Sequence, residues 1–369
     1  MQLSLYYRPV TVVNHKINLL LLGFFWLLTP RLMAQTLGGN AAYSFLRFPA
    51  SPQLAALGGV NVAHATKDVS LAVQNPALLD ASMHAQMATN FNSLYDGVKN
   101  YHWMLGYRHP GLATNFSASL QFFDYGSITQ TDAAGTVFGN LRPRDLVFQL
   151  TASRSYLEKW NYGLTLKWIA SNYGMYRSQA AAVDVGLLYK DTARFFQAGI
   201  TVKNMGVQVR RYNSAISEEL PFDLVLGVYK QLENAPIRFS FTAHHLHQFD
   251  IDYNDPAFNA EMGVPAVNNR KFTINKLFRH FVLSTQLLIG QKVEVTVGYN
   301  FLRRNELRIP NVANGLTGFS LGVGAMLPKL QIRYARTYFQ NTTAYNQLGL
   351  NLPLNLYFGL GKWGEKIGW

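Results

Sequence analysis

The chain has 369 residues, of which 49% are apolar, 14% aromatic and only 14% charged, with a formal net charge of +13 and no cysteine. That charged share is far below the roughly 25% of an ordinary soluble domain, which disfavours a cytosolic globule. The lack of cysteine excludes disulfides, thiolate metal sites and thiol catalysis. No apolar run reaches the about 20 residues of a transmembrane helix, which excludes a helical membrane protein. Dispersed apolar residues with abundant Tyr, Phe and Gly instead favour a transmembrane β-barrel.

Residues 1–34 have the organisation of a secretory signal peptide. A basic stretch with Arg8 and Lys16 precedes an apolar segment over 17–28, and the small residue Ala34 allows cleavage before Gln35. Without this segment the formal net charge falls to +10, from 30 basic and 20 acidic residues. Beyond it no basic cluster is longer than a pair, so we expect no nucleic-acid partner.

Residues 35–84 lack periodic alternation and are rich in Ala, Gly and Pro. A barrel of many strands has a lumen that is either plugged or open, and we expect this segment to be an N-terminal hatch that plugs it. Its most distinctive motifs are Gly58-Gly59 and Asn75-Pro76-Ala77. Tight-turn chemistry explains these residues, because Gly permits positive φ and Pro fixes φ. A hinge in the hatch is the alternative.

From residue 85 to residue 354, apolar and polar residues alternate with a period of two. The clearest segment is 160–168, where Trp160, Tyr162 and Leu164 share one face with Leu166 and Trp168. Aromatic residues at both ends match the two girdles of an outer-membrane barrel. The alternation predicts about fourteen antiparallel strands, near 85–93, 101–109, 114–124, 145–154, 160–172, 179–190, 195–204, 222–231, 236–246, 279–289, 292–301, 316–326, 329–339 and 345–354.

The connections between these strands alternate in length. Every second connection is short, whereas the intervening ones are often long, as at 125–144, 205–221, 247–278 and 302–315. Short periplasmic turns and long extracellular loops are typical of outer-membrane barrels, so we expect the long connections outside the cell. Residues 355–369 follow the last strand as an extension to which the sequence assigns no role.

Charged residues in the polar phase of the strands should point into the lumen: Lys167, Lys203, Arg238, Arg333, Asp184 and Glu294. We expect them to pair with one another and with the hatch, because buried charges need partners. A path for an anion is the alternative.

Three motifs with catalytic or binding associations are not supported by their context. Gly318–Gly322 matches a nucleophile elbow, but Ser320 falls in mid-strand. Gly359–Gly364 matches a dinucleotide fingerprint, but too little chain follows for the required helix. The acidic residues from Asp250 to Glu261, just after three histidines, approach calcium-loop spacing, yet Asp255 occupies the position that needs Gly. We therefore predict a solvated loop there, and no catalytic residue, cofactor or metal.

The order of these segments resembles a known family. A hatch with Gly58-Gly59 and Asn75-Pro76-Ala77 before fourteen strands is similar to the FadL-like outer-membrane barrels. Within that family, residues 45–49, 55–59 and 75–79, together with the Asn204–Gly206 and Leu220–Phe222 run, resemble the PorV/PorQ branch of the type IX secretion system of Bacteroidota. The resemblance implies a non-catalytic subunit of the attachment complex, embedded in outer-membrane lipid, that holds a PorZ-like surface protein beside PorU-like and PorV-like components.

A surface that grips a protein partner is expected in the longest connection, 247–278. It carries Phe249, Ile251, Tyr253, Phe258 and Met262, residue types that are common at interfaces. The alternative is that these side chains fold over the barrel mouth and pack on the hatch. A FadL-like uptake channel for hydrophobic small molecules is the alternative function. It requires an apolar pocket and a lateral opening, often made by a bulge or kink in one strand, and the sequence offers no unambiguous kink of this kind.

Overall fold

The computed structural model describes residues 41–95, 97–213, 217–251, 272–290, 292–306, 315–339 and 344–358. Backbone contacts divide the chain into two units, Met1–Gln35 and Thr36–Trp369, and every described residue belongs to the second. The expected signal peptide lies outside the described residues. None of the described helices is long and apolar enough to cross a membrane.

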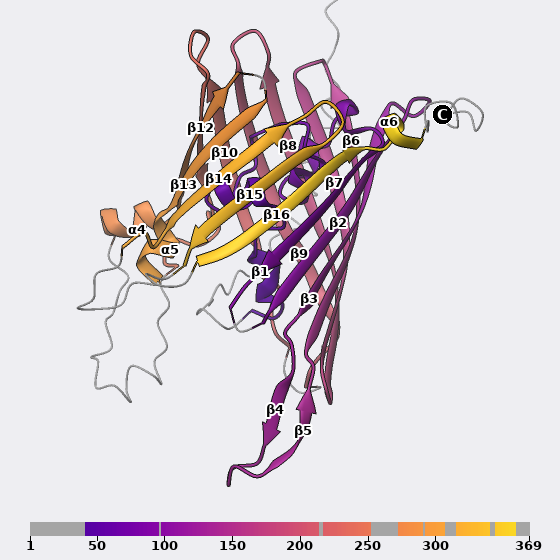
Figure 1. Ribbon diagram of the computed structural model, residues 1–369, viewed down its shortest axis with the longest axis vertical. Helices are drawn as coiled ribbons and strands as arrows, with labels where there is room; N and C mark the ends of the chain where they lie inside the picture. The colour runs from indigo at the N-terminus through magenta and orange to yellow at the C-terminus, as the bar shows by residue number, and fades with distance from the viewer. Residues whose placement is uncertain are drawn as a thin grey trace, which may run out of the picture. The chain divides into compact units, whose positions relative to one another are not determined.

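The described strands form a closed antiparallel barrel of fourteen strands, in which β1 pairs with β16 (Figure 1). This confirms the predicted fold class, and all fourteen predicted strands are present. The wall strands are β1 (Gln86–Ser93), β2 (Lys99–His109), β3 (Thr114–Asp124), β6 (Arg144–Tyr156), β7 (Trp160–Tyr173), β8 (Tyr176–Asp191), β9 (Phe196–Arg210), β10 (Asp223–Gln231), β11 (Ile237–Ala243), β12 (Phe281–Ile289), β13 (Val293–Asn300), β14 (Phe319–Met326), β15 (Gln331–Tyr338) and β16 (Ala344–Pro353).

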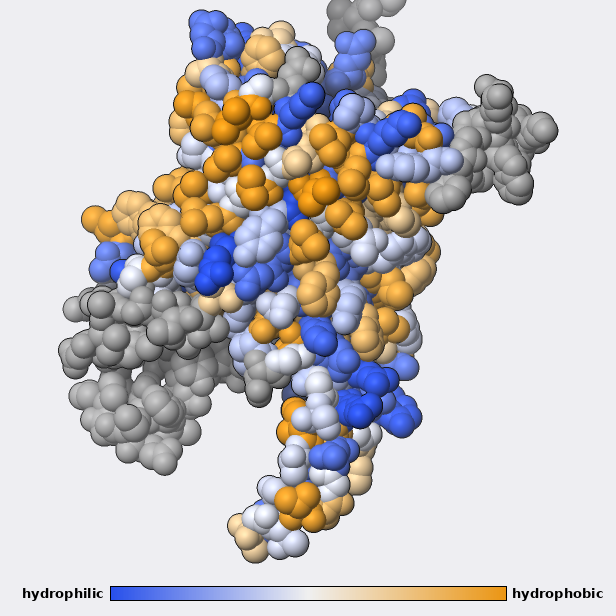
Figure 2. Space-filling view, viewed as in Figure 1, coloured by the Kyte–Doolittle hydropathy of each residue, from blue (hydrophilic) through white to orange (hydrophobic). Residues whose placement is uncertain are grey.

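The period-two alternation separates an apolar outer face from a polar lumen. In β7, Trp160, Leu164 and Trp168 are exposed, whereas Thr165 and Lys167 are buried. Figure 2 shows apolar side chains gathered over the outer faces of the wall strands. Because exposed Leu, Phe and Trp on every second position would be unfavourable in water, this outer face is the lipid-facing surface of a transmembrane barrel.

The long connections contain structure that the sequence did not predict. In the connection over 125–144, β4 (Ile128–Thr131) and β5 (Val137–Leu141) form a separate hairpin that projects from the end of the barrel (Figure 1). Asp132 stabilises its turn, since its Oδ1 accepts from Ala134 N at 2.9 Å and Thr136 N at 2.8 Å. Two short helices, α4 (Ile274–Arg279) and α5 (Phe301–Glu306), lie in other long connections, and α6 (Asn355–Phe358) follows β16. We call the end of the barrel that carries the β4–β5 hairpin, α4 and α5 the long-loop end, and the opposite end, where α6 lies, the short-turn end.

The N-terminal segment lies inside the barrel as a hatch of short helices (indigo in Figure 1): η1 (Ser44–Arg47), α2 (Pro52–Ala56), η2 (Val69–Val73), η3 (Pro76–Leu78) and η4 (Ala81–Met83). Most of these helices begin at a side chain that accepts a backbone N–H, as Ser51, Asp68 and Asn75 do. Leu54 and Leu78 pack with Leu188 of β8 in a small apolar cluster. The hatch is therefore held by local caps and by apolar clusters that combine its own side chains with those of the wall.

Five of the six inward-pointing charges pair with one another or with the hatch, as predicted, whereas Arg238 donates to the wall amides of Gln231 and Gln286. Lys167 Nζ lies 2.5 Å from Asp184 Oδ2 within the wall. Arg333 joins wall and hatch, because its guanidinium contacts Glu294 at 2.6 Å and Asp68 of the hatch at 3.1 Å. These pairs satisfy charges that a plugged lumen shields from water.

Candidate functional site

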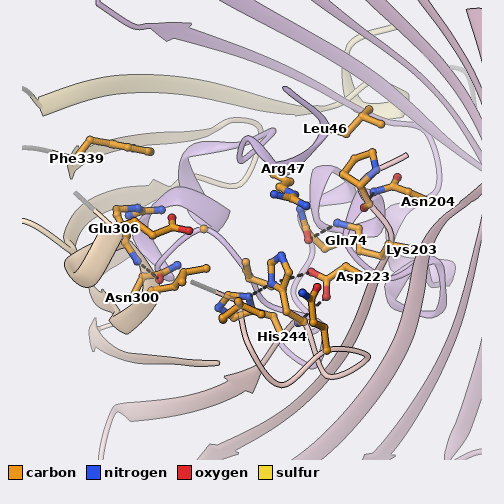
Figure 3. Close-up of a pocket in the computed structure, with 18 residues that line it drawn as sticks. Leu46, Arg47, Gln74, Lys203, Asn204, Asp223, His244, Asn300, Glu306 and Phe339 are labelled. Atoms are coloured by element: carbon orange, nitrogen blue, oxygen red, sulfur yellow. Dashed lines mark hydrogen bonds and ion pairs between the residues drawn. The ribbon is translucent and has the colours of Figure 1, made fainter. Parts of the chain in front are cut away.

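A cavity lies between the hatch and the wall at the long-loop end (Figure 3). It has a volume of about 300 Å³, and we call it the long-loop cavity. The hatch contributes η1, the Gly59-Val60 turn and Gln74, while β9, β10, the segment after β11 and α5 contribute the wall side. Its lining mixes apolar side chains such as Leu46 and Phe339 with charged ones, so it is an amphipathic site.

Two of the cations that line this cavity come from the wall and are hydrogen-bonded to the hatch. Lys203 Nζ donates to Gln74 Oε1 at 2.7 Å. The Arg303 guanidinium donates to the carbonyl oxygen of Gly58 at 3.2 Å and to Ser320 Oγ at 3.1 Å, and it lies 4.4 Å above the Phe339 ring. Burial lowers the Arg303 pKa to about 10, which still leaves the group charged at neutral pH. Arg47 lines the cavity as a third cation, and Asp223 and Glu306 add two acidic side chains, so the lining carries charges of both signs.

A histidine–aspartate cluster forms another part of the cavity wall. Asp223 begins β10, and His244 and His245 follow the end of the paired strand β11. The Nδ1 atoms of the two histidines face each other 2.5 Å apart, and His245 N donates to Asp223 Oδ1 at 2.6 Å. Burial lowers the pKa of each histidine to about 3, so both rings are neutral at physiological pH.

A β-bulge in β9 shapes the same region. Val183 of β8 pairs with Met205 and Val185 pairs with Val202, so that Lys203 and Asn204 together oppose Asp184. Asn204 adopts a left-handed φ of 58°, and its N donates to Asp184 Oδ1 at 2.7 Å. The sequence contains no unambiguous sign of this bulge. The alternating pattern conceals the bulge because one extra residue shifts the phase of a strand without interrupting its apolar composition.

Gly58 and Gly59 have φ values of 92° and 95°, in the left-handed region that glycine tolerates best. The Gly58 carbonyl also accepts from Asn300 Nδ2 at 3.0 Å, and Gly59 lines the long-loop cavity.

Asn75, Pro76 and Ala77 lie elsewhere, buried against β7, β8 and β9. Asn75 Oδ1 caps η3 by accepting from Ala77 N at 3.0 Å. The structure therefore brings Gly59, but not these three residues, to the cavity.

The predicted partner-binding residues divide between described and undescribed parts of the chain. Phe249 stacks on Phe272 with ring centroids 5.3 Å apart and remains 40% exposed. Ile251 lines the long-loop cavity. Tyr253, Phe258 and Met262 lie outside the described residues. The role of this set in partner binding stays a prediction.

Asp223 and Arg303 line the cavity but were not predicted as site residues, and His244 and His245 were considered only beside a calcium-loop pattern. The available signal was a His-His pair at the end of one strand and an aspartate at the start of its neighbour. Only the strand pairing brings those residues together, so spacing along the chain could not reveal the cluster.

Fold and cavity together define a transmembrane barrel of fourteen strands with an internal hatch and an amphipathic cavity at its long-loop end. No protein-family model matches the sequence, and no curated protein matches it. Among solved structures, the chain is similar to the CymD monoaromatic hydrocarbon channel, with 12% identity over 84% of this chain and 97% of that chain and a TM-score of 0.48. It is also similar to a deltaS2 mutant of the TodX monoaromatic hydrocarbon channel (14% identity, 83% and 97% coverage, TM-score 0.43) and to a Pseudomonas aeruginosa FadL homologue (10% identity, 77% and 93% coverage, TM-score 0.39).

Proposed function

We propose that the chain is a non-catalytic, permanently plugged outer-membrane barrel that anchors a surface protein of a type IX secretion attachment complex, as PorQ-like proteins do. The observation that carries this proposal is the tight fit between hatch and wall around the lumen. A fixed plug suits a protein that holds a partner better than one that passes solutes through its lumen.

The fit depends on wall glycines that let the hatch backbone approach. A Cβ atom added to Gly163 of β7 would lie 2.6 Å from the Pro76 carbonyl carbon, and one added to Gly186 of β8 would collide with the Asn75 side chain. Other wall strands present glycine to the hatch in the same way, at Gly106, Gly199, Gly298 and Gly322. Contacts on six strands thus hold the hatch from several sides, and no hatch movement is possible without breaking many of them.

The hatch also divides the spaces at the two ends of the barrel. A second cavity of about 1120 Å³ opens at the short-turn end, and it shares no lining residue with the long-loop cavity. Gly59 and Gln74 of the hatch border the long-loop cavity, whereas Lys67 and Asp80 border the other. This arrangement supports a barrel that does not conduct.

Support for the particular secretion system comes from the resemblance of the sequence motifs. The Asn204–Gly206 segment contains the bulge, and Pro221 accepts from Asn204 Nδ2 at 2.8 Å, so the run that carries the resemblance builds one wall of the cavity. The partners proposed on this basis are a PorZ-like surface protein and PorU-like and PorV-like components.

The test is partner retention by cells that carry a tagged chain. Replacing Phe249, Tyr253 and Phe258 by Ser should leave the barrel folded and release a surface protein into the medium. The matched control replaces Ile128, Val137 and Phe138 by Ser, because these exposed apolar side chains lie on the β4–β5 hairpin of another long connection. Release of the surface protein by the hairpin variant alone would mean that the partner docks on the hairpin. Retention of the surface protein by both variants would contradict the anchoring function.

The plug itself is tested by deleting residues 40–80. The deleted form should conduct ions in planar bilayers, while the intact chain should remain closed because its hatch fills the lumen. Equal conductance of the two forms would contradict a plugging role.

A second candidate function, uptake of a hydrophobic small molecule with an acidic group, is favoured by the bulge and by the amphipathic cavity. A bulge can open a lateral path through a barrel wall. Leu46, Val60 and Phe339 could contact the apolar part of such a molecule, and Lys203 its acidic group. Val60→Trp should block the cavity. Loss of uptake of a labelled fatty acid with retention of the surface partner would favour this function over anchoring.

A further inference from the structure

We propose that Asp223, His244 and His245 form a binding site for a divalent transition-metal ion of the zinc class in the wall of the long-loop cavity. One ligand atom from each residue lies within 4.8 Å of the other two. The site is independent of anchoring or uptake, because it depends only on how β10 and β11 end.

Strand pairing brings the three ligands together. β10 and β11 are antiparallel neighbours, with Leu226 opposite Ala243, so the start of β10 lies beside the end of β11. Figure 3 shows Asp223 and His244 close together at the cavity. The pairing of two wall strands thus places a carboxylate next to two imidazoles, and imidazole with carboxylate is a ligand set that suits Zn²⁺.

Hydrogen bonding within the protein leaves this cluster incompletely satisfied. His244 is 2% exposed, its Nδ1 faces only the Nδ1 of His245, and its Nε2 has no hydrogen-bond partner among the described residues. Two rings that face each other through Nδ1 can share one proton, so one Nδ1 must donate it and the other must accept it. A metal ion would accept a lone pair from both Nδ1 atoms at once.

The backbone of the site is held in an unusual conformation. His245 has a left-handed φ of 55°, and its N donates to Asp223 Oδ1 at 2.6 Å. Left-handed non-glycine residues persist only where their surroundings impose them, and they concentrate at functional sites. Here the turn brings the side chain of His245 back toward Asp223, with 3.8 Å between Nδ1 and Oδ2.

Binding of a zinc ion requires only a small change in the distance between the two histidine Nδ1 atoms. Zn–N bonds of about 2.0 Å hold two tetrahedral ligand nitrogens about 3.3 Å apart. The Nδ1 atoms, now 2.5 Å apart, would separate by less than 1 Å as an ion enters. Three protein ligands leave one coordination position for a ligand from the cavity. The positive charges of Lys203 and Arg47 lie nearby and oppose an ion at His245, while the Asp223 carboxylate supplies a negative ligand that offsets part of this repulsion.

The experiment titrates the purified full-length barrel, in detergent and with a histidine-free tag, with Zn²⁺ against a chromophoric chelator. We expect one equivalent to bind, and Co²⁺ to give visible d–d absorption of a low-coordinate site. His245→Ala and Asp223→Asn should each weaken binding by more than the roughly 10–100-fold that loss of an outer-shell partner causes. His247→Ala is the matched control, since it removes a neighbouring imidazole outside the ligand group and should preserve binding.

Heat-modifiable migration in gels checks that each variant forms a folded barrel, and His245→Gln replaces any variant that fails. The absence of stoichiometric Zn²⁺ binding to the folded chain would overturn the proposal and leave a structural hydrogen-bond cluster. Unchanged affinity in folded His245→Ala or His245→Gln, or loss of binding in His247→Ala alone, would overturn the assignment of these ligands.

Discussion

At the scale of single residues, the hatch is positioned by side chains that replace missing backbone partners. Asn75 shows this most clearly, because its Oδ1 caps η3 and its Nδ2 donates to the Val62 carbonyl at 2.8 Å. The buried amide therefore joins two hatch segments while it lies against the Gly186 backbone. The lack of a side chain at Gly163 of β7 and at Gly186 of β8 is as important for this packing as the presence of Asn75.

Gly163→Ala tests this fit. The added methyl group would lie 2.6 Å from the Pro76 carbonyl carbon, so we expect overpacking to destabilise hatch docking by about 1–3 kcal/mol. Limited proteolysis of the hatch in detergent measures this effect. Gly139→Ala in β5 is the control, because its new methyl group would be 3.4 Å from Gln130 Oε1 and away from the hatch. Equal proteolysis of both variants would argue against the close approach.

His64 gives the folded hatch a predictable response to acid. The ring is 1% exposed, packs against Tyr229 with centroids 4.7 Å apart and has no hydrogen-bond partner for either nitrogen among the described residues. Burial and then the charges of Arg238 and Arg333 lower its pKa to about 3. The unfolded chain, with a pKa near 6.5, binds the proton first, so stability falls as pH drops from about 6.5 toward 3.

We expect His64→Phe to remove this part of the acid sensitivity while keeping the aromatic contact. Urea unfolding at pH 7.5 and pH 5 measures the difference. Between pH 7.5 and pH 5, the free energy of unfolding of the natural chain should fall by about 2 kcal/mol more than that of the variant. This figure follows from about 1.36 kcal/mol for each pH unit below 6.5. Parallel pH dependence of the two proteins would show that His64 is not kept neutral by burial.

At the scale of elements, the bulge divides β9 into two parts that pair with different neighbouring strands. Before Asn204, β9 pairs with β8 and β10, but its pairing with β10 ends where Lys203 faces Asp223. Beyond the bulge, β9 continues to Arg210 along β8 alone. The irregularity therefore separates a closed wall from a free edge at the long-loop cavity.

Asn204 should tolerate Gly better than Val. Both substitutions remove the hydrogen bond from Nδ2 to Pro221, but Val also places a branched side chain at a φ of 58°. We expect Val to be less stable than Gly by about 1–2 kcal/mol, the usual penalty of the left-handed region. Urea unfolding followed by tryptophan fluorescence compares the two. A Val variant as stable as the Gly variant would mean that the bulge relaxes easily.

At the scale of the whole barrel, the alternation of long and short connections assigns its two ends to two sides of the membrane. The β4–β5 hairpin and helices α4 and α5 belong to long connections, whereas Lys159 lies in the short turn between β6 and β7. The assignment of the long-loop end to the cell exterior remains a prediction from this asymmetry.

Single cysteines test that assignment without interference, since the chain has none. Ala133→Cys, in the hairpin turn, should react with an impermeant thiol reagent on intact cells, and Lys159→Cys should react only after the outer membrane is permeabilised. Both positions are exposed, so accessibility to the reagent differs only through the membrane. The reverse labelling pattern would invert the topology.

The sequence by itself determined the barrel, because period-two alternation directly records which side chains face lipid and which face the lumen. Trp160, Leu164 and Trp168 identify a wall strand without any knowledge of its neighbours. Turn residues such as Gly58 and Asn75 likewise identify hatch turns, because their requirements are local.

Only the tertiary structure determined the cavity and its chemistry. Asp223 meets His244 and His245 because two strands pair, and Arg333 meets Asp68 across 265 sequence positions because the hatch lies inside the wall. The bulge at Asn204 likewise depends on the opposing Asp184. Such contacts depend on register and closure, which form only when the whole barrel assembles, so residue spacing within one strand does not encode them.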